Sequence, residues 1–260
     1  MELNLDSRVA IVTGGSEGIG RATAALLAAE GARVAICARR PDVLDEAAAA
    51  ISAETGASIL AIPADVTSDE DMRHLVTTVA AELGPPRILV NNAGTAAGGA
   101  FEQITDEAWG ADLDLKLLAA ARLARLVIPG MREAGGGSIV NVTAIAGKHP
   151  AASSVPTSVS RAAGIALTKA MSKDLAADNI RVNAVCIGLI KSGQIGRMAS
   201  RRFADVSQDE AYARMGANVP LGRVGEAEEA ANVIAFLASD AASYVTGVAV
   251  NIDGGTSSSV

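Results

Sequence analysis

The sequence of 260 residues predicts an α/β fold, a doubly wound parallel sheet of seven strands with helices on both faces. Short runs rich in Val and Ile alternate with longer amphipathic segments, which is the pattern of repeated strand–helix–strand units. These short runs are almost continuously apolar, as expected of strands that are buried on both faces. The first of them leads through a glycine-rich turn into a helix. Because no linker or internal repeat interrupts the alternation, we expect one domain over 1–260.

The predicted elements follow one another with short connections. Strands are expected at 8–13, 32–38, 58–63, 87–94, 137–143, 180–188 and 247–255. Helices are expected at about 19–30, 42–55, 69–83, 106–130, 158–178 and 226–239. The stretch 189–225 is too long for an ordinary connection, and such stretches often serve as lids or binding segments. We therefore expect a lid or substrate-binding segment there.

The composition argues against nucleic acid and metal as ligands. The formal net charge is −7 and the pI is about 4.9, whereas nucleic-acid binding needs a cationic face. Aromatic residues make up only 2% of the chain, which leaves few platforms for stacking bases. His74 and His149 are the only histidines and no CxxC motif occurs, so the sequence predicts no metal site.

The chain shows no sign of membrane insertion or export. No apolar run approaches the ~20 residues of a membrane-spanning helix. The segment MELNLDSRVAIVTGG lacks the cationic start and cleavage site of a signal peptide. Cys37 and Cys186 lie in apolar, strand-like runs and are expected to be buried free thiols, as in a reducing compartment. We expect a cytoplasmic location and no membrane partner.

The glycine-rich turn reads TGGSEGIG, from Thr13 to Gly20. Glycines let the backbone turn tightly and approach a pyrophosphate, and the helix that follows offers free N–H groups and the positive end of its dipole. The strand–turn–helix context is what makes such a motif specific. The sequence therefore predicts a dinucleotide-binding site at this turn.

The spacing T-G-x-x-x-G-I-G resembles that of the short-chain dehydrogenase/reductase (SDR) family. Further segments match the motifs of that family in the right order: ADV (64–66), NNAG (91–94), RVNAVCIG (181–188) and YVTGVAVNIDGG (244–255). Within the family the chain most resembles the 3-oxoacyl-(acyl-carrier-protein) reductases. Because the resemblance covers nearly the whole chain, it implies a Rossmann-type fold, a nicotinamide cofactor and a small-molecule substrate. It also implies a homotetramer built through the helices at 106–130 and 158–178 and the last strand.

The resemblance implies which residues hold the cofactor. It assigns the phosphates to Gly14, Ser16, Gly18, Ile19 and Gly20. By the same resemblance, Asp65 and Val66 are expected to flank the adenine. The adjoining ribose is lined by Asn92, Ala93 and Gly94. The nicotinamide end is approached by Gly188, Ile190 and Ser192.

The segment CARR at the end of the second predicted strand bears on the choice of cofactor. An acidic residue there accepts hydrogen bonds from the ribose 2′-OH, while an arginine suits a 2′-phosphate. Ala38 occupies the usual acidic position and Arg39 and Arg40 follow, which favours NADP(H) over NAD(H). Glu17 opposes this, since its carboxylate would repel a 2′-phosphate. The alternative is that the two arginines are only a solvated pair at a strand end.

The positions that match the catalytic Asn, Ser, Tyr and Lys of the family all carry other residues. Thr157 and Arg161 stand at the Tyr and Lys positions, Ala144 at the Ser position and Lys116 at the Asn position. A phenol has a pKa of about 10 that a nearby cation can lower, whereas the aliphatic hydroxyl of Thr157 is a far weaker acid. Arg161 keeps the positive charge and can hold a ribose, but it does not release its proton near neutral pH.

Another group is therefore needed for proton transfer, and Lys116 is the first candidate. Burial near Arg161 would lower its pKa toward the range of a general acid or base. The alternative is an Asp112–Lys116 pair on a solvated helix face. His149, in the loop after the fifth strand, is the second candidate because its ordinary pKa suits proton transfer. An exposed loop histidine without a function is the alternative.

Several further side chains are candidates for contact with substrate. Thr143 beside Ala144, and Ser153 and Ser154 in the following loop, offer hydroxyl groups. Arg197, Arg201 and Arg202 in the long segment would suit an anionic substrate such as an acyl thioester carrier. The alternative, which the sequence favours over substrate contact, is a helix with a solvated charged face.

These features predict an NAD(P)(H)-dependent oxidoreductase with a divergent acid/base site. Its substrate would be a carbonyl, hydroxyl or enone compound or an acyl thioester. Two other functions remain open on the same fold: a non-redox enzyme such as an isomerase, lyase or aldolase, and a cofactor-binding protein without turnover. The fold alone does not choose among them.

Overall fold

Seven parallel strands form the central sheet in the computed structural model of the chain, which describes residues 2–259. In spatial order they are β3 (Ile59–Pro63), β2 (Arg33–Ala38), β1 (Val9–Thr13), β4 (Ile88–Asn91), β6 (Gly137–Ala144), β8 (Ile180–Ile187) and β9 (Ala249–Ile252). Every neighbouring pair runs parallel, so the predicted doubly wound sheet is confirmed. The strand order changes direction beside β1 and β4, and ligands of open α/β sheets bind at the carboxyl ends of the strands at such a point.

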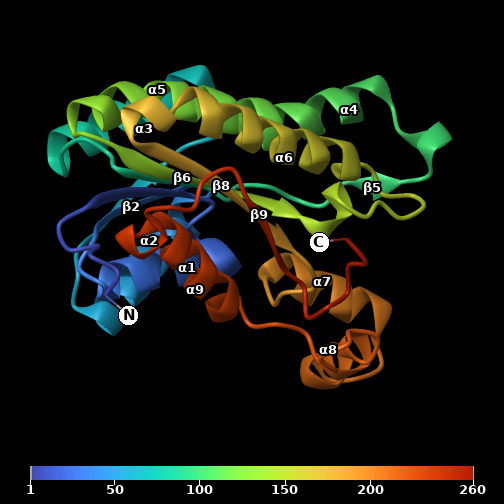
Figure 1. Cartoon of the computed structure of the whole chain (residues 1–260). Helices are drawn as coiled ribbons and strands as arrows, with labels where there is room; N and C mark the ends of the chain where they lie inside the picture. The colour runs from blue at the N-terminus through green and yellow to red at the C-terminus, as the bar shows by residue number, and fades with distance from the viewer. Residues whose placement is uncertain (1, 260) are drawn as a thin grey trace.

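Helices cover both faces of the sheet (Figure 1). One face carries α1 (Gly18–Ala29), α2 (Pro41–Thr55) and α9 (Ala227–Ala238). The other face carries α3 (Asp69–Glu82), α5 (Ala119–Glu133) and α6 (Thr157–Asp174). Successive residues of β1 point to opposite faces, since Ala10 packs with the first group and Ile11 with the second. Burial on both faces explains why the strand sequences are continuously apolar.

Side-chain caps stabilise the starts of several helices. The Ser68 hydroxyl accepts a hydrogen bond from the Asp71 N–H at the start of α3, and Glu226 and Glu229 form a reciprocal capping box at the start of α9. The first residue before α1 behaves differently, because Glu17 makes no side-chain hydrogen bond to the helix start. The N–H groups in the first turn of α1 therefore lack the partner that a capping side chain supplies.

The helix predicted over 106–130 is interrupted. It consists of α4 (Asp106–Leu113), a π-helical turn labelled η2 (Asp114–Leu118), and α5. A π-turn inserts an extra residue into the helix and is frequent at functional sites. Lys116 lies within this turn and is buried, with 6% of the residue exposed.

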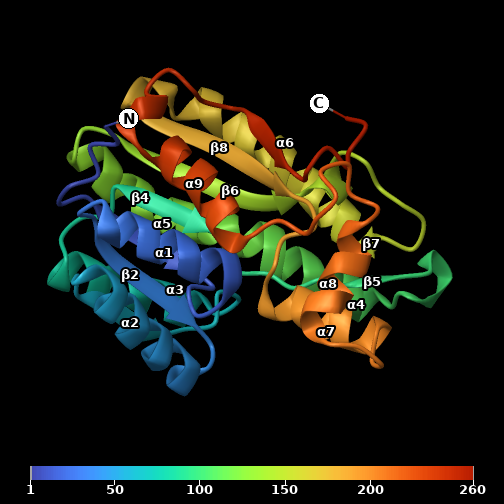
Figure 2. The same cartoon turned by 90° about the horizontal axis from the view of Figure 1, so that it is seen from below.

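The long segment 189–225 folds into two helices, α7 (Gly193–Arg202) and α8 (Gln208–Gly216). They enclose a small apolar core of their own that includes Ala199 and Met215. Figure 2 shows them at the same end of the molecule as the short antiparallel pair β5 (Gly98–Gly99) and β7 (Val155–Pro156), which the sequence did not predict.

Single turns of 3₁₀ helix complete the secondary structure. They are η1 (Phe101–Gln103), η3 (Ile145–Gly147), η4 (Ala176–Asp178) and η5 (Asp240–Ala242). Cys37 and Cys186 are buried and unpaired, as predicted. Within residues 2–259, no helix combines the length and the apolar character needed to cross a bilayer.

Candidate active site

A cleft of about 870 Å³ opens at the carboxyl ends of the strands. Most of the residues predicted to bind a cofactor line it: Gly14, Ser16, Ile19, Arg39, Asp65, Val66, Asn92, Ala93, Gly94, Arg161, Gly188, Ile190 and Ser192. The cleft therefore runs from the turn before α1 to Arg161 of α6. Its volume lies within the range of sites for organic ligands.

Gly18 and Gly20 are the two predicted cofactor residues that do not line the cleft. A Cβ on Gly20 would overlap the carbonyl oxygen of Gly14, and a Cβ on Gly18 would lie 2.9 Å from the Cβ of Ser192. These glycines allow the helix, the turn and the α7 segment to pack closely. Gly14 itself has a φ of +64°, which glycine adopts without strain.

Hydrogen bonds join the glycine turn to the end of β4. The Asn92 side-chain amide donates to the carbonyl oxygens of Thr13 and Gly14 at 2.9 and 3.1 Å. The Thr13 hydroxyl oxygen accepts from the backbone N–H groups of Asn92 and Ala93, both at 3.0 Å. These contacts fix the two loops on either side of the point where the strand order changes direction.

The end of the cleft beside β2 carries arginines and carboxylates. Arg40 forms an ion pair with Glu17 at 2.6 Å, so this carboxylate is neutralised by its neighbour. Arg39 lines the cleft and has no ion-pair partner within residues 2–259. Burial raises the pKa of Asp65, but hydrogen bonds from Thr67 and the Arg39 charge outweigh it and lower that pKa below its ordinary value. Arg39 is therefore a cation available to an anionic ligand.

Arg161 lies at the opposite end of the cleft. One guanidinium nitrogen donates to the carbonyl oxygen of Val142 at 2.7 Å, and another lies 2.8 Å from the Cβ position of Gly94. Its Nε has no hydrogen-bond partner in the part of the chain that the structure describes. Burial lowers the pKa of Arg161 to about 10, against the opposing charge of Asp112. The side chain remains a cation at neutral pH.

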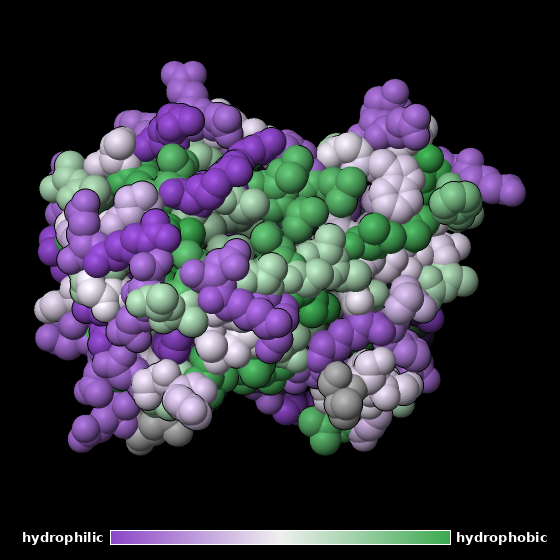
Figure 3. Space-filling view, turned by 45° about the horizontal axis from the view of Figure 1, so that its top comes forward, coloured by the Kyte–Doolittle hydropathy of each residue, from purple (hydrophilic) through white to green (hydrophobic). Residues whose placement is uncertain are grey.

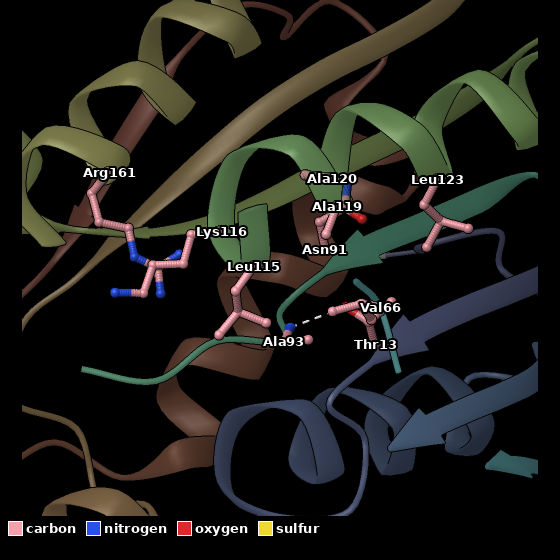
Figure 4. Close-up of a pocket in the computed structure, with 10 residues that line it drawn as sticks. All are labelled: Thr13, Val66, Asn91, Ala93, Leu115, Lys116, Ala119, Ala120, Leu123 and Arg161. Carbon is pink, nitrogen blue, oxygen red and sulfur yellow. Dashed lines mark hydrogen bonds between the residues drawn. The ribbon is translucent and has the colours of Figure 1, made fainter. Parts of the chain in front are cut away.

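Lys116 lies directly beside Arg161. Figure 4 shows the two side chains converging from η2 and α6 on a small cavity of about 10 Å³, room for about one water molecule. Arg161 lines both this cavity and the large cleft, whereas Lys116 lines only the cavity. Burial and the Arg161 charge lower the pKa of Lys116, while the hydrogen bond and charge of Asp112 oppose this shift.

Asp112 and Lys116 form an ion pair, but the pair is buried. The alternative prediction, a pair on a solvated helix face, is therefore wrong. The side chains of Lys116 and Asp112 are 0% and 2% exposed. The second oxygen of Asp112 accepts a hydrogen bond from the Ser160 hydroxyl at 2.6 Å. The pair is therefore an internal element of the site.

The Thr157 hydroxyl has three partners. It donates to the carbonyl oxygen of Ala97 at 2.5 Å and accepts from the Ala97 N–H at 2.9 Å. It also accepts from the Lys116 ammonium at 2.7 Å. The only proton of this hydroxyl is thus held by Ala97, and the oxygen links α6 to the segment before β5.

The other predicted substrate residues lie apart from this network. His149 and Ser153 are exposed and Ser154 is half-buried, and the three are outside the lining of the cleft. Thr143 and Ala144 both line the cleft. The Thr143 hydroxyl donates to the Val185 carbonyl oxygen at 3.0 Å, so its proton is directed into the sheet.

The sequence did not single out Ser160, and it placed Asp112 only in a solvated pair. Asp112 carried a signal in its spacing of four residues before Lys116, but Ser160 is 48 residues from Asp112. Gln194 and Ile195 line the cleft and were also not singled out in the sequence. Of the three arginines considered for an anionic substrate, Arg197 lines the cleft and Arg201 and Arg202 do not. Within residues 2–259, no group of three His, Cys, Asp or Glu side chains is placed to hold a metal ion.

Known proteins resemble the chain over nearly its whole length. A family model described as Enoyl-(Acyl carrier protein) reductase matches residues 14–257. Dehydrogenase/reductase SDR family member 4 of Oryctolagus cuniculus is 38% identical over 255 residues, which cover 98% of this chain and 95% of that protein.

Two solved structures share the fold closely. L-sorbose reductase from Gluconobacter frateurii, complexed with NADPH and L-sorbose, has a TM-score of 0.95 and 34% identity, and all of each chain is covered. An NADPH-bound short-chain oxidoreductase from Pseudomonas aeruginosa PAO1 has a TM-score of 0.92 and 38% identity over 98% of this chain and 99% of that one. The latter is described as containing an atypical catalytic center.

Proposed function

Because the chain belongs to the short-chain dehydrogenase/reductase family, we propose that it is an NADP(H)-dependent oxidoreductase of a carbonyl or hydroxyl compound. Ketones, enones and acyl thioesters are the substrate classes it would take. The observation that carries the proposal is the cleft, which joins a glycine turn and a helix start at one end to Arg161 at the other. The NADPH-bound relatives support it, since they share the fold and more than 30% of their residues.

The residues of the cleft fit a dinucleotide. The start of α1 lacks a side-chain cap, so its N–H groups and dipole are available to phosphate oxygens near Gly14, Ser16 and Ile19. Asp65 and Val66 would flank the adenine. Asn92, Ala93, Gly94 and Arg161 would hold the riboses, with Gly188, Ile190 and Ser192 near the nicotinamide. When bound, this cofactor supplies or accepts the hydride.

The charges beside β2 favour a 2′-phosphate over a 2′-hydroxyl. Arg39 lines the cleft without an ion-pair partner in the described chain, and an arginine recognises phosphate through several donors at once. Glu17 is held by Arg40 at 2.6 Å, which reduces its repulsion of a phosphate. We therefore infer a preference for NADP(H).

The acid/base site is rebuilt from residues unlike those of the usual family pattern. We assign the proton in carbonyl reduction to Lys116, whose ammonium donates a hydrogen bond to the Thr157 hydroxyl at 2.7 Å. When a substrate oxygen replaces Ala97 as the acceptor, Thr157 passes on its own proton and receives one from Lys116. Thr157 then never rests as an alkoxide, and Lys116 becomes neutral. Arg161 stabilises the developing negative charge on the substrate oxygen.

The α7 segment would act as a lid. Ser192, Gln194 and Arg197 line the cleft, and Gln194 accepts a hydrogen bond from the Ala96 N–H at 3.0 Å. This contact bridges α7 to the segment after β4, so closure over a ligand would order both sides of the cleft. His149, Ser153 and Ser154 have no role in this proposal.

The proposal includes a homotetramer, as in the family resemblance. Figure 3 shows hydrophobic residues running across the face that carries α5 and α6, between hydrophilic ones. Leu118, the last residue of η2, and Val159 of α6 are each 45% exposed, and exposed apolar residues that gather on one face mark interaction surfaces. Light scattering during size-exclusion chromatography would test the assembly, and a monomeric chain would contradict it.

Fluorescence titration with NADPH and NADH tests the cofactor site, and a turnover screen over ketones, enones and acyl thioesters tests the reaction. We expect NADPH to bind more tightly than NADH and to be consumed with at least one carbonyl substrate. Lys116→Met should lose turnover by about 10²–10⁴-fold while it still binds NADPH. Absence of binding to either cofactor would overturn the proposal.

A further inference from the structure

Asp112 is a fully engaged carboxylate beneath the site. One of its oxygens pairs with the Lys116 ammonium and the other accepts the Ser160 hydroxyl at 2.6 Å. Asp112, Lys116 and Ser160 come from α4, η2 and α6, and only 4%, 6% and 1% of these residues is exposed. A buried carboxylate held from three helical segments has a fixed orientation, because neither of its oxygens is left to water.

The charges around Asp112 explain why a carboxylate is needed there. Lys116 is buried and Arg161 half-buried, and these two cations line the same small cavity. The charged groups that act on Lys116 are Asp112 from α4 and Arg161 from α6. A buried cation without a counterion tends to lose its proton. Asp112 is the anion that offsets this tendency, because burial and Arg161 both act against the charged form of Lys116.

The direction of the Lys116 side chain also depends on Asp112. A lysine has a flexible four-carbon stem and a compact charge with rotatable donors. Here its ammonium is held between Asp112 and Thr157. Ser160 lies on α6 one turn after Thr157. Its hydrogen bond to Asp112 therefore ties this carboxylate to the helix that also carries the Thr157 hydroxyl, the acceptor of the Lys116 ammonium.

We propose that Asp112 is the positioning residue of the proton donor: oriented by Ser160, its carboxylate keeps Lys116 charged and aims it at Thr157. This inference rests on the proposed function of Lys116 as proton source. Asp112 and Ser160 act through Lys116 and do not line the cofactor cleft. Changing them should therefore alter proton transfer and leave cofactor binding unchanged.

The test compares Asp112→Asn, Ser160→Ala and Asp114→Asn. Asp114 is a matched control in the same helical stretch, because its carboxylate pairs with Arg122 and is partly exposed. Each variant is measured for NADPH affinity by fluorescence and for kcat/KM of carbonyl reduction across pH. We expect Asp112→Asn to lose about 10²–10⁴-fold in rate near neutral pH. Its high-pH loss of activity should also begin at a lower pH, and Ser160→Ala should shift less in the same direction.

A second measurement does not depend on turnover. The chain has only five lysines, so isotope labelling of the lysine side chains lets the Lys116 signal be assigned with Lys116→Met and titrated by NMR. We expect Lys116 to titrate at lower pH in Ser160→Ala, and lower still in Asp112→Asn, than in the unchanged protein. Folded variants in which Lys116 titrates as in the unchanged protein would overturn the inference.

Should Asp112→Asn fail to fold, Ser160→Ala and Asp112→Glu carry the same test. Ser160→Ala frees the carboxylate to turn, whereas Asp112→Glu keeps the charge and displaces it by one methylene. A titration of Lys116 unmoved in both would contradict the inference. Failure of the proposed function would give a different result. The protein would then not bind NADPH, or would bind it without turnover, while the Lys116 titration still responds to substitution of Asp112.

Discussion

The Lys116 ammonium lies 2.7 Å from the Thr157 hydroxyl oxygen, and that hydroxyl is also bound by both backbone groups of Ala97. The Thr157 side chain therefore joins three segments: the π-turn, the start of α6 and the irregular segment before β5. Its structural role can be separated from its role in proton transfer.

Thr157→Val keeps the shape of the side chain and removes the hydroxyl. It leaves Lys116 and the two backbone groups of Ala97 without this partner, and a buried polar group without a partner costs about 1–3 kcal/mol. We expect the free energy of unfolding to fall by about 1–3 kcal/mol in urea denaturation. Thr157→Ser retains the hydroxyl and should stay within about 1 kcal/mol of the unchanged protein. Equal stability of the Thr157→Val and Thr157→Ser variants would show that the hydrogen bonds of this hydroxyl do not stabilise the fold.

Arg39→Ala should reduce the affinity for NADPH much more than that for NADH. A hydrogen bond to a charged group contributes about 1.5–3 kcal/mol, which corresponds to about 10–150-fold in Kd. Arg40→Ala should also weaken NADPH binding but by less, because Arg40 is engaged with Glu17 and acts by neutralising that carboxylate. Calorimetric titration of both cofactors measures the difference. A parallel loss of NADPH and NADH affinity in Arg39→Ala would show that the arginine does not read the 2′-phosphate.

Gly20→Ala should damage the fold around the glycine turn. Its Cβ would overlap the Gly14 carbonyl oxygen, a backbone atom that cannot move aside without opening the turn. We expect a fall in thermal stability and a loss of NADPH binding. Gly110→Ala is the control within α4, where a Cβ meets nothing within 4 Å. This control should be stabilising by up to about 1 kcal/mol, because alanine favours a helix interior. A Gly20→Ala protein with unchanged melting and binding would contradict the packing argument.

The central sheet could be predicted from the sequence because burial on both faces favours apolar residues at successive positions of a strand, as at 9–12 in β1. The α7 helix carried a comparable signal, since Ile195, Ala199 and Phe203 recur every four residues and pack in one small core. The stretch was expected to be a lid, with a helix weighed only to explain its charged residues and without stated bounds. Reading its periodicity would have located the helix.

The details of the acid site could not be predicted in the same way. The residues from Leu113 to Leu118 are compatible with an uninterrupted α-helix, so no pattern marks the π-turn that buries Lys116. The partners of the site are distant in sequence: Ser160 is 48 residues from Asp112, and Thr157 is 60 from Ala97. These contacts depend on how α4, η2 and α6 pack, which helix periodicity does not specify.

Cys37 should resist thiol reagents until the protein unfolds. Its side chain is 0% exposed, and burial raises its pKa to about 12 against a weaker backbone hydrogen bond. Thiolate is the reactive form, so both access and ionisation oppose modification. We expect reaction with a chromogenic disulfide reagent to be very slow in the native protein and complete in denaturant. Rapid labelling of Cys37 in the native state, located by peptide mass spectrometry, would contradict the burial of β2.

The rate of carbonyl reduction should fall as the pH rises, and the midpoint of this fall should lie below the ordinary pKa of a lysine. Lys116 donates a proton only while it is charged, and burial together with Arg161 places its pKa below the usual 10.5 despite the opposing contribution of Asp112. Reduction should therefore be fastest at pH values below this lowered pKa and decline as pH rises through it. Oxidation of the alcohol product needs neutral Lys116 and should rise over the same interval. Measurement of kcat/KM in both directions from about pH 6 to about pH 11 would show the two opposite trends.

Lys116→Met should abolish this pH dependence in both directions, whereas Lys173→Met, a change of an exposed lysine on α6, should preserve it. A profile that Lys116→Met leaves unchanged would assign the proton to another group and remove Lys116 from the mechanism.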